Sequence, residues 1–380
     1  MKNDKVDANM LFPASERKAE LEEKHSVLQE FLKANSLDAF VISRHENIAW
    51  ATAGLVEMRV GIPREIAVGS LLVTRDGRSY YLTTNNEAPR LAQEEFVHLD
   101  YQPVIQPWYD NDVQASIKKI VGSGKVASDD ATIGVPAISM KPLRLPLTDG
   151  EIARYRSLGE HIAEATTDTL LELRPGMTEA TMQAMVCRRL LAQSILPSVL
   201  LTSVDERIRN YRHAVPREGV LQKFGMLNFC ARRWGLSVSI TRYVHFGDMP
   251  AELEEKFAAV TRVNASLLHG TREGTRADEL FTMAQRAYTE QGYPGEEQMH
   301  HQGGATGYWE REWVARPGGS ERVLKQQGIA WNPSLQGAKI EDTVVLHHGK
   351  IEALTRTPRL PVVETSRDGS IYQSAGVLLA

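Results

Sequence analysis

Two predicted strands place polar side chains on a common face, a pattern typical of the floor of a ligand-binding site. Side chains alternate between the two faces of a strand, so residues two apart point the same way. Amide and hydroxyl groups on such a face can form hydrogen bonds with a ligand. A half-exposed antiparallel pair would show the same alternation, and both interpretations stay open here. The shared face carries Met226, Asn228 and Cys230 in residues 225–231, and Ser237, Ser239 and Thr241 in residues 236–245.

His213, in a predicted loop before the first of these strands, is one candidate for proton transfer, although a lone loop histidine is more often a surface residue. An imidazole suits this role because its pKa lies near neutrality. Glu341, in the segment KIEDTVVL, is the carboxylate expected to orient His213 or to hold a cationic part of a substrate. His301 follows His300 just before a glycine-rich turn and is a candidate second acid or base. Each of these residues also has a structural interpretation, as a surface, turn or backbone-bonded group.

Further side chains could contact a substrate directly. An arginine such as Arg232 binds an anionic group through two parallel hydrogen bonds, unless it is only a solvated charge. Trp309, in YWEREW, would line a pocket wall or an interface. Cys230 is interpreted as packing, because a small buried cysteine is far more often structural than nucleophilic. The candidates for substrate binding in this half of the chain are Asn228, Ser239, Thr241, Asn332, Arg232 and Trp309.

The elements that would position these residues differ between the two halves of the chain. A helical pattern over residues 15–34 precedes short apolar runs separated by polar turns, which predicts a mixed sheet with helices around it. Residues 131–148 carry three prolines and are expected to form a linker. The C-terminal half combines strands with long helices, which indicates an α+β class. Its predicted helices are residues 149–173, 179–193, 251–268 and 278–291.

Composition limits the classes of function. The chain has 380 residues and a net charge of −4, so there is no bulk electrostatic case for binding nucleic acid or an anionic membrane. No run of about 18 apolar residues is present, which argues against a transmembrane helix. The polar first ten residues argue against a signal peptide, and we expect a cytoplasmic protein. The two cysteines lack the spacing of a disulfide framework or a cysteine zinc site.

Several motifs occur in the order found in the creatinase, aminopeptidase P and methionine aminopeptidase family. They are LRPGMTEATM (173–182), the strands at 225–247, HHQGGATGYW (300–309) and KIEDTVVL (339–346). The N-terminal segments RHENIAWATAG and NNEAPRLAQEE resemble the smaller domain that precedes the catalytic domain in creatinase and aminopeptidase P. The resemblance implies a creatinase-like α/β domain over residues 1–147. It also implies a catalytic domain of the pita-bread fold, two pseudo-symmetric α/β halves around a pit, over residues 148–380.

The resemblance also exposes a loss of metal ligands. Metal enzymes of this family use two Asp, one His and two Glu, and only Glu341 survives among the matching positions. Divalent metals need deprotonated oxygen or imidazole donors, so one carboxylate with two amides and a hydroxyl would bind too weakly. We therefore expect no metal and no other cofactor. The other matching positions carry Asn228, Ser239, Gly304 and Asn332.

A metal-independent hydrolase is the function that this substitution pattern favours. It would cleave a C–N bond of a small amino-acid-like, amide or amidine substrate, with His213 as acid and base, as is thought for creatinase. Thr241 stands where creatinase has a glutamate, which argues against the same grip on a guanidinium. Lyase or cyclising chemistry is also open. The alternatives are a non-catalytic binding or interaction protein and a metallo-aminopeptidase of the Xaa-Pro type with relocated ligands.

The resemblance further implies a homodimer in which the N-terminal domain of one subunit closes the pit of the other. In creatinase-like dimers an arginine of the N-terminal domain reaches the partner's site. The matching segment here is LVEMRVGIPRE (55–65), in which Arg59 and Arg64 are the candidates.

Overall fold

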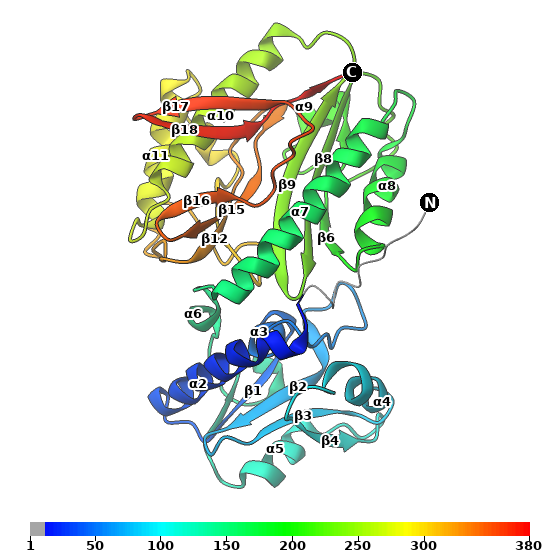
Figure 1. Ribbon diagram of the computed structural model, residues 1–380, viewed down its shortest axis with the longest axis vertical. Helices are drawn as coiled ribbons and strands as arrows, with labels where there is room; N and C mark the ends of the chain where they lie inside the picture. Colours follow the sequence, from blue (N-terminus) through cyan, green and yellow to red (C-terminus); the bar gives the residue numbers. More distant parts are fainter. Residues whose placement is uncertain (1–11) are drawn as a thin grey trace. The chain divides into compact units, whose positions relative to one another are not determined.

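The computed structural model describes residues 12–380, which form two compact units (Figure 1). Among the described residues, the first unit runs to Arg144 and includes Trp234–Leu236, and the second contains Leu145–Arg233 with Ser237–Ala380. The boundary predicted between residues 147 and 148 remains a proposal about where independently folding parts meet. Within the described residues, no helix is both long enough and apolar enough to cross a membrane.

The N-terminal unit is built on a five-stranded mixed sheet in the order β4-β3-β2-β1-β5. The β1–β2 and β2–β3 pairs are antiparallel, whereas β4 and β5 join the sheet in parallel. The segment TRDGRS, one of the polar turns expected between the apolar runs, connects β2 to β3, with Gly77 at a φ of +90° that favours glycine. The strands are β1 (Ala39–Arg44), β2 (Ile66–Thr74), β3 (Ser79–Thr84), β4 (Gln102–Gln106) and β5 (Val126–Ser128).

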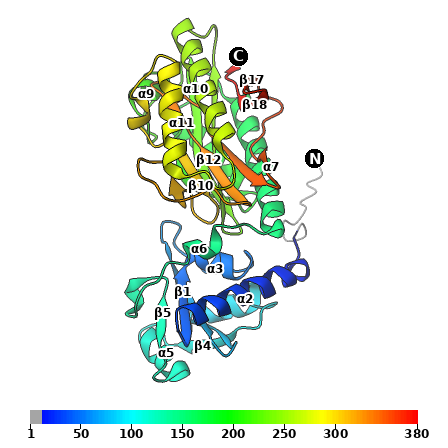
Figure 2. The same cartoon turned by 90° about the vertical axis from the view of Figure 1, so that its left-hand side faces the viewer.

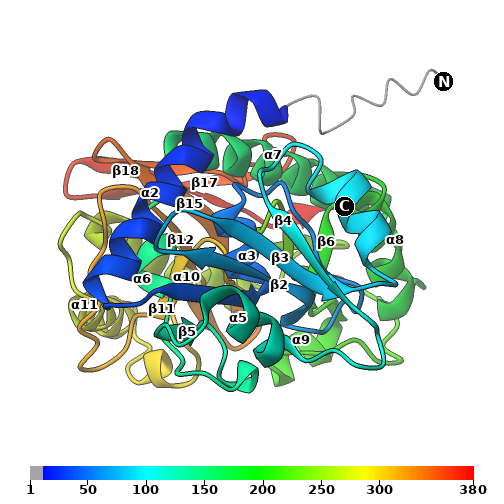
Figure 3. The same cartoon turned by 90° about the horizontal axis from the view of Figure 1, so that it is seen from below.

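Helices cover both faces of this sheet (Figure 3). The apolar side of α5 (Val113–Val121) packs with Ala39 and Val41 of β1 in one hydrophobic cluster. Phe40 points to the opposite face, where its ring meets Phe31 of α2 (Lys18–Ala34) at a centroid distance of 5.1 Å. The unit's shorter helices are α3 (His45–Ala51), α4 (Ala88–Arg90) and α6 (Lys141–Arg144), with η1 (Ala14–Arg17), η2 (Leu91–Glu95) and η3 (Ala131–Ile133).

The C-terminal unit contains two larger sheets, each with a pair of long helices. In the first sheet, the order is β19-β9-β8-β6, and the short strand β7 also pairs with β8. Helices α7 and α8 contact this sheet. Its elements are α7 (Asp149–Glu172), α8 (Glu179–Leu191), β6 (Leu196–Leu200), β7 (Ser203–Val204), α9 (Asp205–Asn210), β8 (Phe224–Arg233), β9 (Leu236–His245) and β19 (Leu378–Leu379).

The second sheet has the order β11-β10-β12-β15-β16 and is antiparallel throughout. Figure 2 shows α10 and α11 side by side over this sheet. Its elements are α10 (Ala251–Gly270), α11 (Ala277–Glu290), η4 (Glu296–Gln298), β10 (Gly303–Thr306), β11 (Trp313–Val314), β12 (Gln327–Trp331), β15 (Asp342–His347) and β16 (Lys350–Ala353). Two hairpins complete the unit: β13 (Ser334–Leu335) with β14 (Ala338–Lys339), and β17 (Val362–Arg367) with β18 (Ser370–Ala375).

Capping residues and a Pro-Gly pair explain where α7 and α8, the helices on the first sheet of the C-terminal unit, begin and end. Thr148 caps α7 and forms a reciprocal capping box with Glu151, which satisfies two otherwise unpaired backbone N–H groups. The helix stops before Pro175-Gly176, where Gly176 has a φ of +93°. Thr178 then caps α8 by accepting from the backbone N–H of Thr181.

The apolar side of α10 is buried in the core between this helix and the second sheet of the C-terminal unit. It includes Val260, Val263 and Leu267, all at 0% exposure, and it packs against Ile329 and Trp331 of β12. Burial of such side chains contributes about 1.5–3 kcal/mol each. These observations confirm the expected architecture, in which two α/β halves follow a smaller α/β unit.

One buried arginine ties the two sheets together where the polar strands meet. Arg242 of β9 donates to the backbone oxygens of Thr241 and Glu341 at 2.7 and 3.2 Å. It also forms an ion pair of 2.6 Å with Asp342 of β15 and donates to Thr355 and Thr357. All five N–H groups of the guanidinium therefore have acceptors. This side chain fixes β9 against β15 and so sets the spacing of the polar groups that follow on both strands.

Candidate functional site

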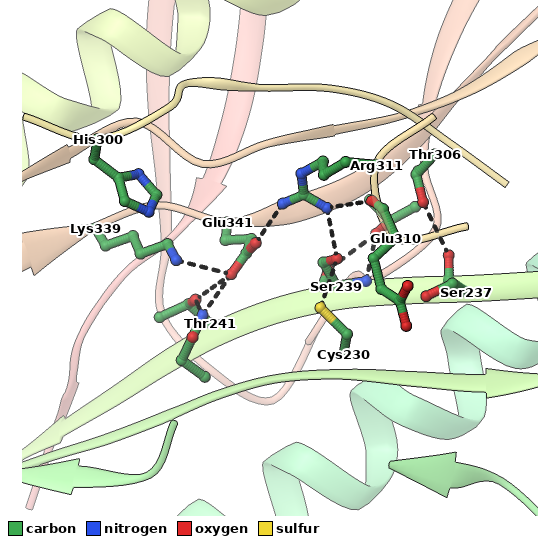
Figure 4. A network of polar contacts seen from close by, with 12 residues as sticks. Cys230, Ser237, Ser239, Thr241, His300, Thr306, Glu310, Arg311, Lys339 and Glu341 are labelled. Carbon is green, nitrogen blue, oxygen red and sulfur yellow. Dashed lines mark hydrogen bonds and ion pairs between the residues drawn. The ribbon is translucent and has the colours of Figure 1, made fainter. Parts of the chain in front are cut away.

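The polar faces of β8 and β9 meet as the alternation predicted (Figure 4). The amide of Asn228 donates to the hydroxyl of Thr241 and to Oε2 of Glu341, the latter at 2.5 Å. Further along the same face, the thiol of Cys230 lies 3.1 Å from the hydroxyl of Ser239. Burial raises the pKa of Cys230 to about 11, so the thiol is protonated at neutral pH and is no nucleophile.

Glu341 is the centre of this network, and both of its oxygens have partners. Oε2 accepts from Asn228 and, at 2.7 Å, from Thr241, and it lies 3.3 Å from the ammonium of Lys339. Oε1 accepts a hydrogen bond of 2.9 Å from Arg311. Burial by itself would raise the pKa of Glu341, but the charges of Lys339 and Arg311 outweigh it and lower the pKa to about 2. The carboxylate is therefore ionised throughout the physiological range.

Arg311 bridges Glu341 and the strand β9. Besides its bond to Glu341, its guanidinium donates to the hydroxyl of Ser239 at 3.0 Å and to the backbone oxygen of Glu310 at 2.7 Å. Its Nε atom is buried without a hydrogen-bond partner among the described residues. Two cations and one carboxylate thus leave this cluster with a net charge of +1.

Three histidines converge next to this cluster. His213 comes from the loop after α9, and its Nε2 lies 3.0 Å from Nε2 of His300. The ring of His301 stacks on that of His300 at a centroid distance of 4.4 Å. One ring nitrogen from each histidine lies within 4.8 Å of the others. The loops are held together by an ion pair between Arg212 and Glu296, which flank the histidines in sequence.

The surroundings keep these imidazoles neutral. Partial burial, followed by the charge of Lys339, lowers the pKa of His300 to about 2. Partial burial and then Arg311 lower the pKa of His301 to about 4. The pKa of His213 is lowered in the same way, first by burial and then by Lys339. At neutral pH all three rings therefore have a lone pair available on one nitrogen.

Asn332 follows β12 and is buried beside the histidine loop. Its backbone N–H donates to the backbone oxygen of Gln302 at 3.0 Å. Its side-chain Oδ1 is buried and has no hydrogen-bond partner among the described residues. An unsatisfied buried acceptor costs about 1–3 kcal/mol, and a ligand that donates an N–H group would remove this cost.

The structure does not join every predicted site residue to this cluster. No hydrogen bond or ion pair links Glu341 to His213 within residues 12–380, so Glu341 does not orient that ring directly. Arg232 lies near the far end of β8, paired with Leu196. Trp309 is half-buried after β10, and the structure shows its backbone oxygen accepting from Thr306. Their predicted contacts with a substrate remain proposals.

Two other arginines were predicted to reach the site from a partner subunit. Arg59 and Arg64 belong to the N-terminal unit, where Arg59 pairs with Glu57 at 3.4 Å and Arg64 is exposed. Their role at the site of a second subunit stays a prediction.

Close backbone packing explains why glycines occupy positions 303 and 304. A Cβ on Gly303 would lie 2.1 Å from the backbone oxygen of Ala330, and one on Gly304 would lie 2.1 Å from that of Trp313. The glycines therefore permit β10 to run close to β12 and β11.

The two units have the pita-bread fold with a preceding α/β domain, and comparisons with known proteins agree with this architecture. Residues 153–348 match the model of "Metallopeptidase family M24", and residues 24–140 match that of the "Creatinase/Prolidase N-terminal domain". The chain belongs to metallopeptidase family M24.

Relatives match over nearly the whole chain. An Xaa-Pro dipeptidase of Pyrococcus horikoshii is 20% identical over 365 residues, covering 89% of this chain and 98% of that protein. The structure of an Xaa-Pro dipeptidase from Bacillus anthracis has a TM-score of 0.69 and 18% identity, covering 95% of this chain and 100% of the other. The N-terminal domain of FACT complex subunit SPT16 from chickpea has a TM-score of 0.62 at 10% identity, covering 89% of this chain and 97% of that domain. The structural likenesses show the fold.

These findings contradict the prediction of a metal-independent hydrolase for amides or amidines. The family is one of metallopeptidases, and the relatives named above include Xaa-Pro dipeptidases, which favours the alternative of a metallopeptidase with relocated ligands. The prediction rested on the loss of carboxylates at the family's ligand positions and kept a metallopeptidase with relocated ligands only among its alternatives. It did not consider that His213 and His300, 87 residues apart, could converge.

The positions that match the family's metal ligands do not themselves fit a divalent cation. Asn228 and Ser239 offer an amide and a hydroxyl, and Gly304 has no room for any side chain. The remaining carboxylate, Glu341, already binds two fixed cations. Each of these would repel a further positive charge by about 4 kcal/mol per unit charge at 4 Å and an effective dielectric constant of 20.

Sequence reasoning missed the part that Arg311 and Lys339 play in this network. Lys339 lies two residues before Glu341 in an extended segment, so the two side chains share a face, and this spacing could have identified it. Arg311 lies in the segment YWEREW, in which only Trp309 is predicted to line a pocket. Its contact with Glu341 joins residues 30 apart in sequence, and no local pattern indicates it.

Proposed function

We propose that this protein is a metal-dependent hydrolase of dipeptides, of the Xaa-Pro dipeptidase type. The observation that carries the proposal is the similarity to Xaa-Pro dipeptidases through both units of the chain, with 89–95% of it covered. The polar network around Glu341 and the adjacent histidines supply the groups that such a reaction needs. A bound divalent metal would activate the attacking water and polarise the scissile carbonyl.

The charge of the site suits a substrate with a free carboxylate. Lys339 uses one N–H group on Glu341 and has two further donors, and the cluster that includes Arg311 carries a net charge of +1. The C-terminal carboxylate of a dipeptide would pair with Lys339. The unpaired Oδ1 of Asn332 would accept a hydrogen bond from the substrate's amino group.

His213 would move the proton in the hydrolytic step. Its ring is neutral at pH 7 because burial and Lys339 lower its pKa, so it can accept a proton from water. The same ring would then protonate the leaving nitrogen as the C–N bond breaks. His301, beside it, would serve as a second acid or base or as a ligand. Ser239 and Thr241 would act by holding Arg311 and Glu341 in place.

Finer points of the proposal concern the assembly and its location. We propose a homodimer in which Arg59 or Arg64 of one subunit reaches the site of the other. The protein would work in the cytoplasm, where Cys187 and Cys230 stay reduced, and would bind neither nucleic acid nor membranes. Light scattering would give the oligomeric state, and Arg59→Ala and Arg64→Ala should leave the fold intact while lowering kcat/KM.

Turnover of defined dipeptides tests the proposed function. Purified protein is stripped with a chelator, reloaded separately with Mn²⁺, Co²⁺ or Zn²⁺, and assayed with Leu-Pro, Ala-Pro and Leu-Leu. We expect hydrolysis of the Xaa-Pro dipeptides by at least one metal-loaded sample and little by the stripped protein. If no dipeptide is cleaved under any loading, the proposal fails.

A non-catalytic binding protein is the second candidate, and one observation favours it. Glu341 is the only carboxylate at the positions that match the family's metal ligands, and it is already ion-paired with Arg311 and Lys339. The site is therefore an ionic network in addition to a place where a substrate would bind. In that case a dipeptide would bind, as measured by calorimetry, without being cleaved. Binding abolished by Lys339→Met, with no product detected over a day, would favour this candidate.

A further inference from the structure

We propose that His213, His300 and His301 together bind one divalent ion of the zinc, cobalt or nickel type. This site lies outside the positions that match the family's metal ligands. It rests on the proposed function for the metal that it locates, and it assigns His213 the part of a ligand in place of an acid and base, because a neutral imidazole has a single lone pair. Its test measures binding and stays separate from catalysis.

The geometry of the three rings is close to that of a metal site. Zinc holds imidazole nitrogens at about 2.0–2.1 Å, and tetrahedral ligands at that radius are roughly 3.3 Å apart. The Nε2 atoms of His213 and His300 are 3.0 Å apart, and one nitrogen of each of the three rings lies within 4.8 Å of the others. Small rotations of the side chains would therefore bring all three to an ion.

The three rings have no competing partners. Within residues 12–380, the ring of His213 bonds only to that of His300, and the ring of His301 makes ring contacts but no hydrogen bond. Nδ1 of His300 is buried and has no hydrogen-bond partner among the described residues. Metal binding would therefore break a single weak contact between two imidazoles.

Three histidines elsewhere in the described residues have hydrogen-bond partners outside any such cluster. His245 bonds to the backbone oxygen of Gly247, His269 to Tyr372 and His161 to the backbone oxygen of Ser157. A second cluster of possible ligands comprises Asp149, His347 and His348. There His347 already bonds to Asp149 at 3.1 Å and lies 3.3 Å from Arg156, so this cluster serves as an internal comparison.

The charges nearby determine which ions fit. Lys339 and Arg311 disfavour any cation here, and Glu341 compensates only one of them. Hard ions such as Mg²⁺ and Ca²⁺ prefer oxygen ligands and would gain nothing from neutral imidazoles. Zinc, cobalt and nickel bind imidazole well, and three histidines leave a fourth position for water or substrate.

Cobalt binding provides a direct test. Chelator-stripped protein is titrated with Co²⁺, the visible d–d absorption is recorded, and the metal retained after gel filtration is counted. We expect one equivalent of cobalt and a spectrum of a four- or five-coordinate nitrogen site. His300→Gln and His301→Gln should each weaken binding at least tenfold, whereas the matched control His348→Gln should leave it unchanged.

Folding of the variants is checked by circular dichroism, and the rise in Tm on adding Zn²⁺ provides a second measurement. The inference is overturned if no cobalt is retained, if His300→Gln and His301→Gln bind like wild type, or if His348→Gln alone abolishes binding. Metal bound by the trio without any dipeptide turnover would refute the proposed function and leave this inference standing. Turnover and cobalt binding both unaffected by the two substitutions would refute the inference alone.

Discussion

Arg311 donates a hydrogen bond of 2.9 Å to Glu341, and this pair occupies the side of β9 where the family's metal ligands are expected. The carboxylate is 3% exposed and the guanidinium 15%, so neither charge is well solvated. Lys339 forms a second ion pair with Glu341, through the other carboxylate oxygen. The side of β9 where the family's metal ligands are expected therefore carries an organised set of charged side chains.

Removing Arg311 should destabilise the protein, because Glu341 would lose one of its two compensating cations. Loss of one partner of a buried pair costs about 3–5 kcal/mol. We expect Arg311→Gln to lower the free energy of unfolding in urea by about that amount. The double variant Arg311→Gln/Glu341→Gln should recover part of the loss. If the double variant is as unstable as the sum of the two single variants, the pair is not coupled.

Acid should lower the free energy of unfolding, because Glu341 becomes protonated. The pKa of this group is about 2 in the folded state and near 4.5 in the unfolded chain, so folding favours the ionised form. Its contribution, on the order of 3 kcal/mol, is fully present above about pH 5 and is lost as the pH falls toward 2. Urea unfolding between pH 6 and 3 should show a steeper loss for wild type than for Glu341→Gln. Equal slopes would show that Glu341 titrates normally in the folded protein.

Arg242 should matter for stability and not for chemistry. Its guanidinium is 2% exposed and holds β9 to β15 through Asp342 and backbone oxygens. Arg242→Met would leave these acceptors unpaired, and we expect a loss of about 3–5 kcal/mol in the free energy of unfolding. Where the variant remains folded, the loss of kcat/KM for a dipeptide, expressed as a free energy, should be far smaller than the loss in the free energy of unfolding. A large loss of activity without loss of stability would place Arg242 in the site.

His213 should affect turnover more than binding. A general acid or base contributes about 10²–10⁴-fold to the rate. If His213 acts as the acid and base and not as a ligand, His213→Gln should retain Co²⁺ as wild type does and lower kcat by at least 100-fold, with a smaller change in KM. His161→Gln, in α7, is a control that should behave like wild type. Unchanged kcat in His213→Gln would remove this residue from the reaction.

Much of the architecture could be predicted from the sequence, because helix periodicity, strand alternation and turn residues are local. The predicted helix over 251–268 matches α10 closely, and the alternation in β8 and β9 placed Asn228 and Thr241 on one face. The C-terminal hairpin β17–β18 was not predicted, since its strands are largely exposed and carry little apolar pattern. The histidine trio was missed because it forms only when two loops fold together. The family assignment from ordered motifs is confirmed, whereas the inferred loss of metal dependence was wrong.

The account depends most on dipeptide hydrolysis that requires a bound divalent metal. The most direct measurement is the rate of Leu-Pro cleavage by one protein preparation, compared before chelation, after chelation and after restoring one equivalent of Co²⁺ or Zn²⁺. We predict activity that disappears with the metal and returns with it. Cleavage that is equally fast in the metal-free protein, or absent in every sample, would contradict the account.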